Sequence, residues 1–225
     1  MSEAQPLKLK VDDDTAVSAL WLEPQRPRAA YVFAHGAGAG MHHSFMAALS
    51  QALHGESVAT LRYQFPYMER GSKRPDSPAV AQAAVRGAVA TARDRLPDTP
   101  LFAGGKSFGG RMTSQAQAAA PMPGVRGLMF VGFPLHPAGK PGIERAAHLD
   151  DVRVPMLFLQ GTRDELAALD LLEGVVRRLG DRAVLRVEDD ADHAFHVRAR
   201  SGRTDAQVVQ ALAEAMAEWA AGQAS

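Results

Sequence analysis

Short apolar runs recur along the chain and alternate with longer segments in which apolar residues have a helical spacing. The first two runs, residues 7–11 and 16–22, flank the acidic segment 12–14 and predict an antiparallel hairpin. The later runs are continuously apolar rather than alternating, which is typical of parallel strands covered on both faces. These later runs span residues 29–34, 57–63, 101–104, 127–133, 156–160 and 184–187.

Segments between and after these strands predict helices. Residues 76–96 carry apolar side chains at every third or fourth position. A second helix, residues 169–179, is expected to end at Gly180. The last helix begins with a capping box formed by Thr204 and Gln207.

The alternation of strands and helices predicts an α/β fold in one domain, residues 1–225. We expect a mostly parallel central sheet of about eight strands, flanked by helices and extended by the antiparallel N-terminal hairpin. Residues 65–78 and 134–142 are rich in Pro and Gly and are interpreted as loops. The segment 133–155 is too short for a large helical cap, so no cap domain is expected. In such sheets ligands bind beyond the carboxyl ends of the strands.

Composition narrows the possible classes of function. The chain has 25 Lys+Arg and 25 Asp+Glu, and this balance disfavours a nucleic-acid binder, which normally carries a basic excess. The absence of cysteine excludes disulfides, thiolate metal sites and a cysteine nucleophile. The N-terminus lacks the apolar core of a signal peptide, and no apolar run is long enough to cross a membrane. We therefore expect a cytoplasmic protein without a membrane partner; its oligomeric state is not indicated.

The sharpest motif is a G-x-S-x-G sequence centred on Ser107. It follows the predicted strand 101–104 directly and precedes a helical run at residues 111–120. This context is that of a nucleophile elbow, a sharp turn that exposes the serine hydroxyl. Glycine at positions 105 and 109 removes side chains that would collide with the neighbouring strand and helix.

A serine hydroxyl needs an adjacent base that is oriented by a carboxylate. Asp164 follows the predicted strand 156–160, and His193 follows the predicted strand 184–187. The order Ser107, Asp164, His193 is the order expected for a nucleophile elbow in this fold class. Two simpler interpretations remain open: Asp164 as a helix N-cap and His193 as a surface histidine.

Acyl transfer also needs N–H donors for the developing oxyanion. We expect one donor to be the backbone N–H of Phe108, directly after the nucleophile, and the other that of Ala37, in the glycine-rich loop after strand 29–34. Lys106, Tyr67 and Phe133 are candidate substrate-binding residues. No carboxylate accompanies His35, His42 and His43 at ligand spacing, so no metal site is expected.

Four stretches together resemble the α/β-hydrolase superfamily, and within it the small, lid-less, dienelactone-hydrolase-like members. The stretches are residues 34–40, 104–110, 160–164 and 191–193. Lys106 and the segments 65–67 and 133–137 are similar to a branch that includes the hydrolase-like domain of a chromatin-complex subunit and a testis-expressed protein. The similarity covers about residues 28–220. Dienelactone hydrolases proper use a cysteine nucleophile, so their specific activity is not implied here.

These observations predict a serine hydrolase that cleaves an ester or similar acyl bond through an acyl-enzyme. Ser107 would be the nucleophile, His193 the base and Asp164 the orienting acid, without any cofactor, and the partner would be a small-molecule acyl substrate. Two alternatives stay open: a hydrolase-like binding or scaffold module with a vestigial site, and an acyl- or peptidyl-transfer enzyme.

Overall fold

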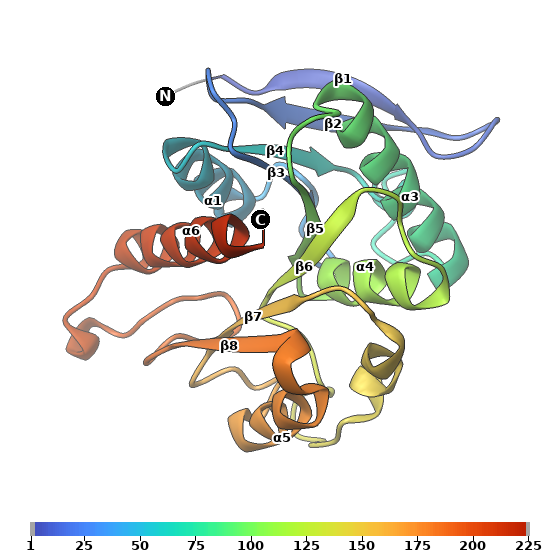
Figure 1. The fold of residues 1–225 in the computed structure, drawn as a ribbon. Coiled ribbons are helices and arrows are strands. Elements are labelled where there is room, and N and C mark those ends of the chain that lie inside the picture. Colours follow the sequence, from blue (N-terminus) through green and yellow to red (C-terminus); the bar gives the residue numbers. More distant parts are fainter. Residues whose placement is uncertain (1–2, 224–225) are drawn as a thin grey trace.

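All strands belong to one eight-stranded sheet in the computed structural model, which describes residues 3–223 (Figure 1). The strand order is β1-β2-β4-β3-β5-β6-β7-β8. The pairs β1–β2 and β2–β4 are antiparallel, and all the other pairs are parallel. The strands are β1 (Gln5–Lys10), β2 (Ala16–Leu22), β3 (Ala29–Ala34), β4 (Val58–Tyr63), β5 (Leu101–Lys106), β6 (Val125–Val131), β7 (Met156–Gly161) and β8 (Ala183–Glu188).

Helices cover both faces of the sheet (Figure 1). One hydrophobic cluster joins α1 and α6 to one face, and a second cluster joins α3, α4 and α5 to the other. Because both faces are covered, every residue of β3 and of β4 is buried, which explains the continuous apolar runs in the sequence. The helices are α1 (Ser44–Gly55), α2 (Pro66–Glu69), α3 (Pro78–Arg95), α4 (Phe108–Ala119), α5 (Leu169–Leu179) and α6 (Asp205–Gly222).

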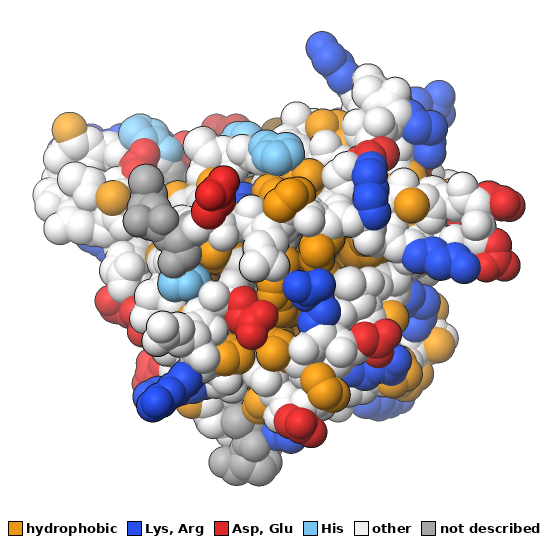
Figure 2. Space-filling view, turned by 90° about the horizontal axis from the view of Figure 1, so that it is seen from above, with side chains coloured by type: hydrophobic (Ala, Val, Ile, Leu, Met, Phe, Trp, Pro, Cys, Tyr) orange, Lys and Arg blue, Asp and Glu red, His pale blue; other side chains and the backbone are white. Residues whose placement is uncertain are grey.

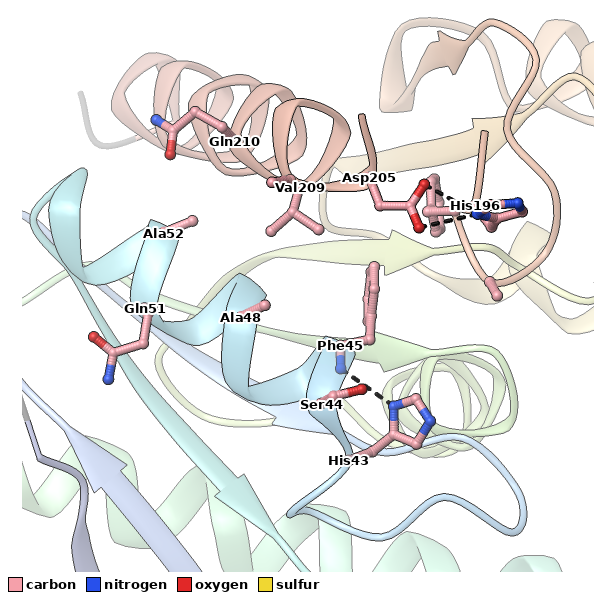
Figure 3. A pocket seen from close by; sticks show the side chains of 13 residues that line it. His43, Ser44, Phe45, Ala48, Gln51, Ala52, His196, Asp205, Val209 and Gln210 are labelled. Atoms are coloured by element: carbon pink, nitrogen blue, oxygen red, sulfur yellow. Dashed lines mark hydrogen bonds and ion pairs between the residues drawn. The ribbon is translucent and has the colours of Figure 1, made fainter. Parts of the chain in front are cut away.

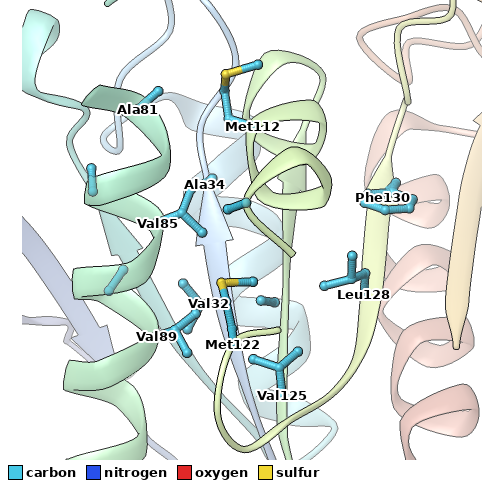
Figure 4. Packing of buried hydrophobic residues seen from close by; sticks show 14 of the residues in the cluster. Val32, Ala34, Ala81, Val85, Val89, Met112, Met122, Val125, Leu128 and Phe130 are labelled. Carbon is cyan, nitrogen blue, oxygen red and sulfur yellow. The ribbon is translucent and has the colours of Figure 1, made fainter. Parts of the chain in front are cut away.

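The helical periodicity in residues 76–96 corresponds to a real packing face. Val85 and Val89 of α3 point toward Val32 and Ala34 of β3 (Figure 4). Met112 of α4 belongs to the same cluster, so α3, α4 and β3 share one packed layer. This layer holds α4, and therefore the residue at its N-terminus, against the sheet.

Several predicted elements are confirmed and others are corrected. The hairpin, the strand 29–34 and the helix 169–179 agree with the structure, and α6 begins with both hydrogen bonds of the expected capping box. The strand predicted at 127–133 instead spans Val125–Val131, because Gly132 has a φ of +68° and turns the chain out of the sheet. Residues 65–78 are not entirely a loop, since they contain the short helix α2.

Helix α1 was absent from the sequence prediction. Its N-cap is His43, whose imidazole accepts a hydrogen bond from the N–H of Phe45 at 3.3 Å. Histidine is an uncommon cap, so the usual start signal was missing. The buried positions Met46, Leu49 and Leu53 nevertheless have helical spacing.

The expected absence of a cap is confirmed for residues 3–223. The connection between β6 and β7 holds only a 3₁₀ helix, Glu144–Asp151. None of the helices in this part of the chain is long and apolar enough to cross a membrane. Figure 2 shows acidic and basic side chains mixed over one face of the molecule, in keeping with the zero formal charge.

Candidate active site

Ser107 occupies the sharp turn between β5 and α4. Its φ of +52° and ψ of −116° lie in a region of backbone conformation that residues other than glycine rarely adopt. The turn is held by two backbone hydrogen bonds: Ser107 N–H donates to the carbonyl of Val131 at 3.2 Å, and Arg111 N–H donates to the carbonyl of Ser107 at 3.1 Å. A strained serine conformation that is fixed in this way is typical of a functional turn.

The glycines on either side of Ser107 are sterically required. A Cβ on Gly105 would lie 2.5 Å from the carbonyl oxygen of Ala34 and 2.9 Å from the backbone of Gly109. A Cβ on Gly109 would lie 2.5 Å from the same oxygen of Ala34. Both contacts are with backbone atoms, so the turn can approach β3 only if neither residue has a side chain.

The structure brings Ser107, Asp164 and His193 together at the carboxyl end of the sheet. His193 Nε2 lies 2.9 Å from Ser107 Oγ, and His193 Nδ1 lies 2.7 Å from Asp164 Oδ2. The carboxylate of Asp164 is only 1% exposed, whereas the imidazole is 27% exposed. A carboxylate only accepts hydrogen bonds, so Nδ1 carries the proton and Nε2 is free to accept the hydroxyl proton of Ser107.

Asp164 is held by further donors, one of which sequence reasoning missed. Its Oδ1 accepts the N–H of Leu166 at 2.8 Å, and its Oδ2 also accepts a hydrogen bond from Gln160 Nε2. The fully buried Gln160 in turn accepts the N–H of Phe133 at 3.0 Å through Oε1. Helix α5 begins only at Leu169, with Ala168 as its N-cap, so Asp164 does not cap that helix.

The loop that carries His193 is fixed by its own acidic residues. Asp192 Oδ1 accepts the N–H groups of Ala194 at 2.8 Å and His196 at 3.0 Å, so this carboxylate braces the loop. His196 Nδ1 lies 3.0 Å from Asp205. That hydrogen bond and charge raise the pKa of His196 above its usual value. His196 is thus engaged at the start of α6 rather than at Ser107.

Lys106 lies beneath the loop of His193. Its Nζ donates a hydrogen bond to the carbonyl of His193 and lies 5.3 Å from the ring centroid of Phe195. Burial lowers the pKa of Lys106 to about 8, and the charges of Asp164 and Asp192 oppose this shift only in part. The side chain therefore braces the loop of His193, in addition to lining the pocket at Ser107.

Replacing Lys106 by methionine should change how stability depends on pH. The unfolded chain keeps the lysine proton up to about pH 10.5, whereas the folded chain releases it from about pH 8. Between these values the unfolded state binds more protons, so the free energy of unfolding of the wild type rises with pH relative to Lys106→Met. Urea denaturation of both proteins at pH 7 and pH 10 measures this difference. If the free energies of unfolding of the wild type and Lys106→Met differed by the same amount at both pH values, the ammonium of Lys106 would not be desolvated in the folded chain.

The loop after β3 faces Ser107. A Cβ on Gly36 would lie 3.7 Å from the Cβ of Ser107, and Ala37 lines the pocket there. None of the hydrogen bonds among residues 3–223 uses the backbone N–H of Ala37 or Phe108. Both predicted donors are therefore free to bind a developing oxyanion.

His35 braces this loop as a neutral imidazole. Its Nδ1 donates to the carbonyl of Gly36 at 2.8 Å, and its Nε2 accepts the N–H of Phe65 at 3.0 Å. Burial lowers the pKa of His35 to about 4, which keeps the ring uncharged at neutral pH. The described residues contain no cluster of three metal-ligating side chains.

Two of the candidate substrate-binding residues are placed away from the pocket at Ser107. Tyr67 is buried and its hydroxyl accepts the N–H of Gly38 at 3.3 Å, so it supports the loop after β3. Phe133 is buried against the rings of Phe130 and Phe158 in the core. Neither lines that pocket, which has a volume of about 330 Å³.

A larger apolar groove of about 720 Å³ continues from this pocket between α1 and α6 (Figure 3). The two cavities share His43, Phe45 and Ala194. Ala48 and Val209 face each other across the groove. Ser107 is therefore reached from an open surface.

Comparison with known proteins gives consistent results for the whole chain. A family model described as "Alpha/beta hydrolase domain" matches residues 27–221. A lid-less serine hydrolase from Xanthomonas campestris is 21% identical, with a TM-score of 0.75 over 97% of this chain and 96% of that chain. A serine hydrolase homologue from Coxiella burnetii is 17% identical, with a TM-score of 0.77 over 96% of this chain and 98% of that chain. A dienelactone hydrolase from Anabaena variabilis is 19% identical, with a TM-score of 0.74 over 97% of both chains.

Proposed function

The chain belongs to the α/β-hydrolase domain family, and from that premise we propose that it is a serine hydrolase acting on esters or similar activated acyl compounds. The observation that carries the proposal is the imidazole of His193, which bridges Ser107 Oγ at 2.9 Å and Asp164 Oδ2 at 2.7 Å. These distances are within the hydrogen-bond reach that proton transfer requires.

The proposed reaction has two halves. In the first, Ser107 Oγ attacks the substrate carbonyl while His193 Nε2 takes the hydroxyl proton and then gives it to the leaving alcohol. In the second, His193 takes a proton from water, the hydroxide attacks the acyl carbon, and the proton returns to Ser107 as the acid is released. Asp164 holds the imidazole and stabilises its positive charge throughout.

Developing negative charge on the carbonyl oxygen would be stabilised by the N–H groups of Phe108 and Ala37. One preorganised donor of this kind is worth roughly 3–4 kcal/mol of transition-state stabilisation. Phe108 is also the first residue of α4, so the positive end of the helix dipole points to the same place. This mechanism requires no cofactor.

The narrower similarity to the lid-less, dienelactone-hydrolase-like branch is part of the proposal. It is supported by the open pocket at Ser107 and by the absence of a cap over residues 3–223. The substrate is then a small molecule that approaches from the surface.

A fluorophosphonate probe tests the proposal directly, because it reacts much faster with an activated serine than with other side chains. We expect stoichiometric labelling, and peptide mass mapping should place the label on Ser107. Heat-denatured protein and Ser107→Ala serve as controls that remain unlabelled. Labelling of native protein at another residue, or none after prolonged incubation, would contradict the mechanism.

A further inference from the structure

A second pocket, of about 420 Å³, also opens at Ser107. It shares Ala37, Ser107 and Leu166 with the pocket described above. Two arginines line this second pocket: Arg111 from α4 and Arg145 from the connection between β6 and β7. The reacting serine therefore has a cationic wall close to it.

Neither guanidinium group has a counter-ion in the part of the chain that the structure describes. Within residues 3–223, neither Arg111 nor Arg145 forms an ion pair at 4.0 Å or less. Nε of Arg111 is buried and has no hydrogen-bond partner. Arg111 lies one helical turn after Ser107 and donates its backbone N–H to the carbonyl of Ser107, so the two side chains start from neighbouring positions.

An anion in this pocket would relieve the repulsion between the two partly buried positive charges. Desolvation of a charged group is costly without a partner. Burial lowers the pKa of Arg111, and the positive charge of Arg145 adds to that effect. Arginine nevertheless stays protonated in proteins, so both positive charges persist near Ser107.

Neighbouring titratable groups do not neutralise these charges. Asp76 also lines the pocket, but its Oδ1 accepts a hydrogen bond from Arg70 at 2.6 Å and its Oδ2 accepts the N–H of Tyr67 at 2.7 Å. His148 Nε2 forms a hydrogen bond with Ser114 Oγ, and the two atoms lie 2.7 Å apart. Burial, together with the charge of Arg111, lowers the pKa of His148 to about 4, so its ring is neutral.

We propose that Arg111 and Arg145 bind a carboxylate on the substrate, so that the preferred substrates are small esters that carry a free carboxylate. A guanidinium fork matches the two oxygens of a carboxylate, and such charge-assisted bonds are the strong ones. The inference rests on the proposed function, because it assigns a substrate class to the site at Ser107.

Matched pairs of esters test this specificity. Mono-p-nitrophenyl adipate and p-nitrophenyl hexanoate have acyl chains of equal carbon number, and only the first carries a carboxylate. In the second pair, 4-acetoxybenzoate carries the carboxylate on its leaving group, and its methyl ester carries none. We expect the wild type to have a kcat/KM at least about tenfold higher for the anionic member of one pair.

Arg145→Gln should lower that ratio by roughly tenfold, mainly through KM, because one charge-assisted contact is lost. Arg145→Lys should keep part of the preference for the anionic ester. Arg153→Gln removes an equivalent charge from an exposed position on the same connection and should leave the ratio unchanged. Ratios near one for both pairs, or ratios that Arg145→Gln does not alter, would overturn the proposal.

Binding of adipate to Ser107→Ala, measured by titration calorimetry, separates this inference from the proposed function. Adipate binding that Arg145→Gln abolishes, together with no ester hydrolysis by the wild type, would support the carboxylate site and reject the serine hydrolase. Ester hydrolysis without carboxylate preference or adipate binding would reject the carboxylate site and leave the serine hydrolase standing.

Discussion

Ser107→Ala should lower kcat for p-nitrophenyl acetate by on the order of 10⁴-fold or more. The expected loss is large because, among residues 3–223, this hydroxyl is the only nucleophile to which the imidazole of His193 is hydrogen-bonded, at 2.9 Å. The change removes one oxygen from a half-buried residue in a turn that backbone hydrogen bonds hold, so the fold should remain intact. Steady-state kinetics and circular dichroism on the same preparation check both expectations.

Ser201→Ala is a suitable control, because Ser201 lies in the short 3₁₀ helix before α6 and outside the pockets at Ser107. It should turn over the ester at the wild-type rate.

Asp164→Asn should also lower kcat for this ester by about 10⁴-fold, because an amide no longer holds the imidazole in the required tautomer. If Ser107→Ala and the wild type hydrolysed the ester equally, the chain would have to be regarded as a hydrolase-like binding module.

Gly109→Ala and Gly174→Ala should have opposite effects on stability. Both glycines are helical, but a Cβ on Gly109 would meet the carbonyl oxygens of Ala34 and His35 at 2.5 and 2.6 Å, whereas nothing lies within 4 Å of a Cβ on Gly174. We expect Gly109→Ala to lower the free energy of unfolding by roughly 2 kcal/mol or more. Gly174→Ala should raise it by about 0.5–1 kcal/mol, through helix propensity.

Thermal unfolding gives the sign of each effect. A protein of this size should lose at least about 4 °C in Tm in Gly109→Ala and gain about 1–4 °C in Gly174→Ala. Gly109→Ala should also lose ester hydrolysis, because the added methyl pushes Ser107 away from β3. A Gly109→Ala variant as stable as the wild type would show that the turn tolerates a wider separation from that strand.

The elements that sequence could predict are those with a local signal. The strand 29–34 is a continuous apolar run between polar segments, and α6 has the capping box of Thr204 and Gln207. The elbow was recognisable because glycines 105 and 109 flank a serine between a strand and a helix. Chain order then pointed to Asp164 and His193, and the structure places all three side chains in contact.

Features that depend on long-range packing were not predictable. Gln160 looks like the polar end of an apolar strand, and only the folded chain shows its amide bonded to Asp164. Arg111 and Arg145 belong to different elements, and their missing partners are visible only when the surrounding charges are placed. Tyr67 and Phe133 are aromatic residues that the sequence offers as candidates for an apolar substrate wall, but both side chains are buried instead.

The open connection between β6 and β7 has a kinetic consequence. Over residues 3–223 no separate unit closes on the serine, so in the proposed mechanism water would have continuous access to the acyl-enzyme. Such a site has no closing step through which a correct substrate could trigger catalysis. In the proposed reaction, selectivity would then depend on the shape and charge of the rim, and product would leave without waiting for a lid to move.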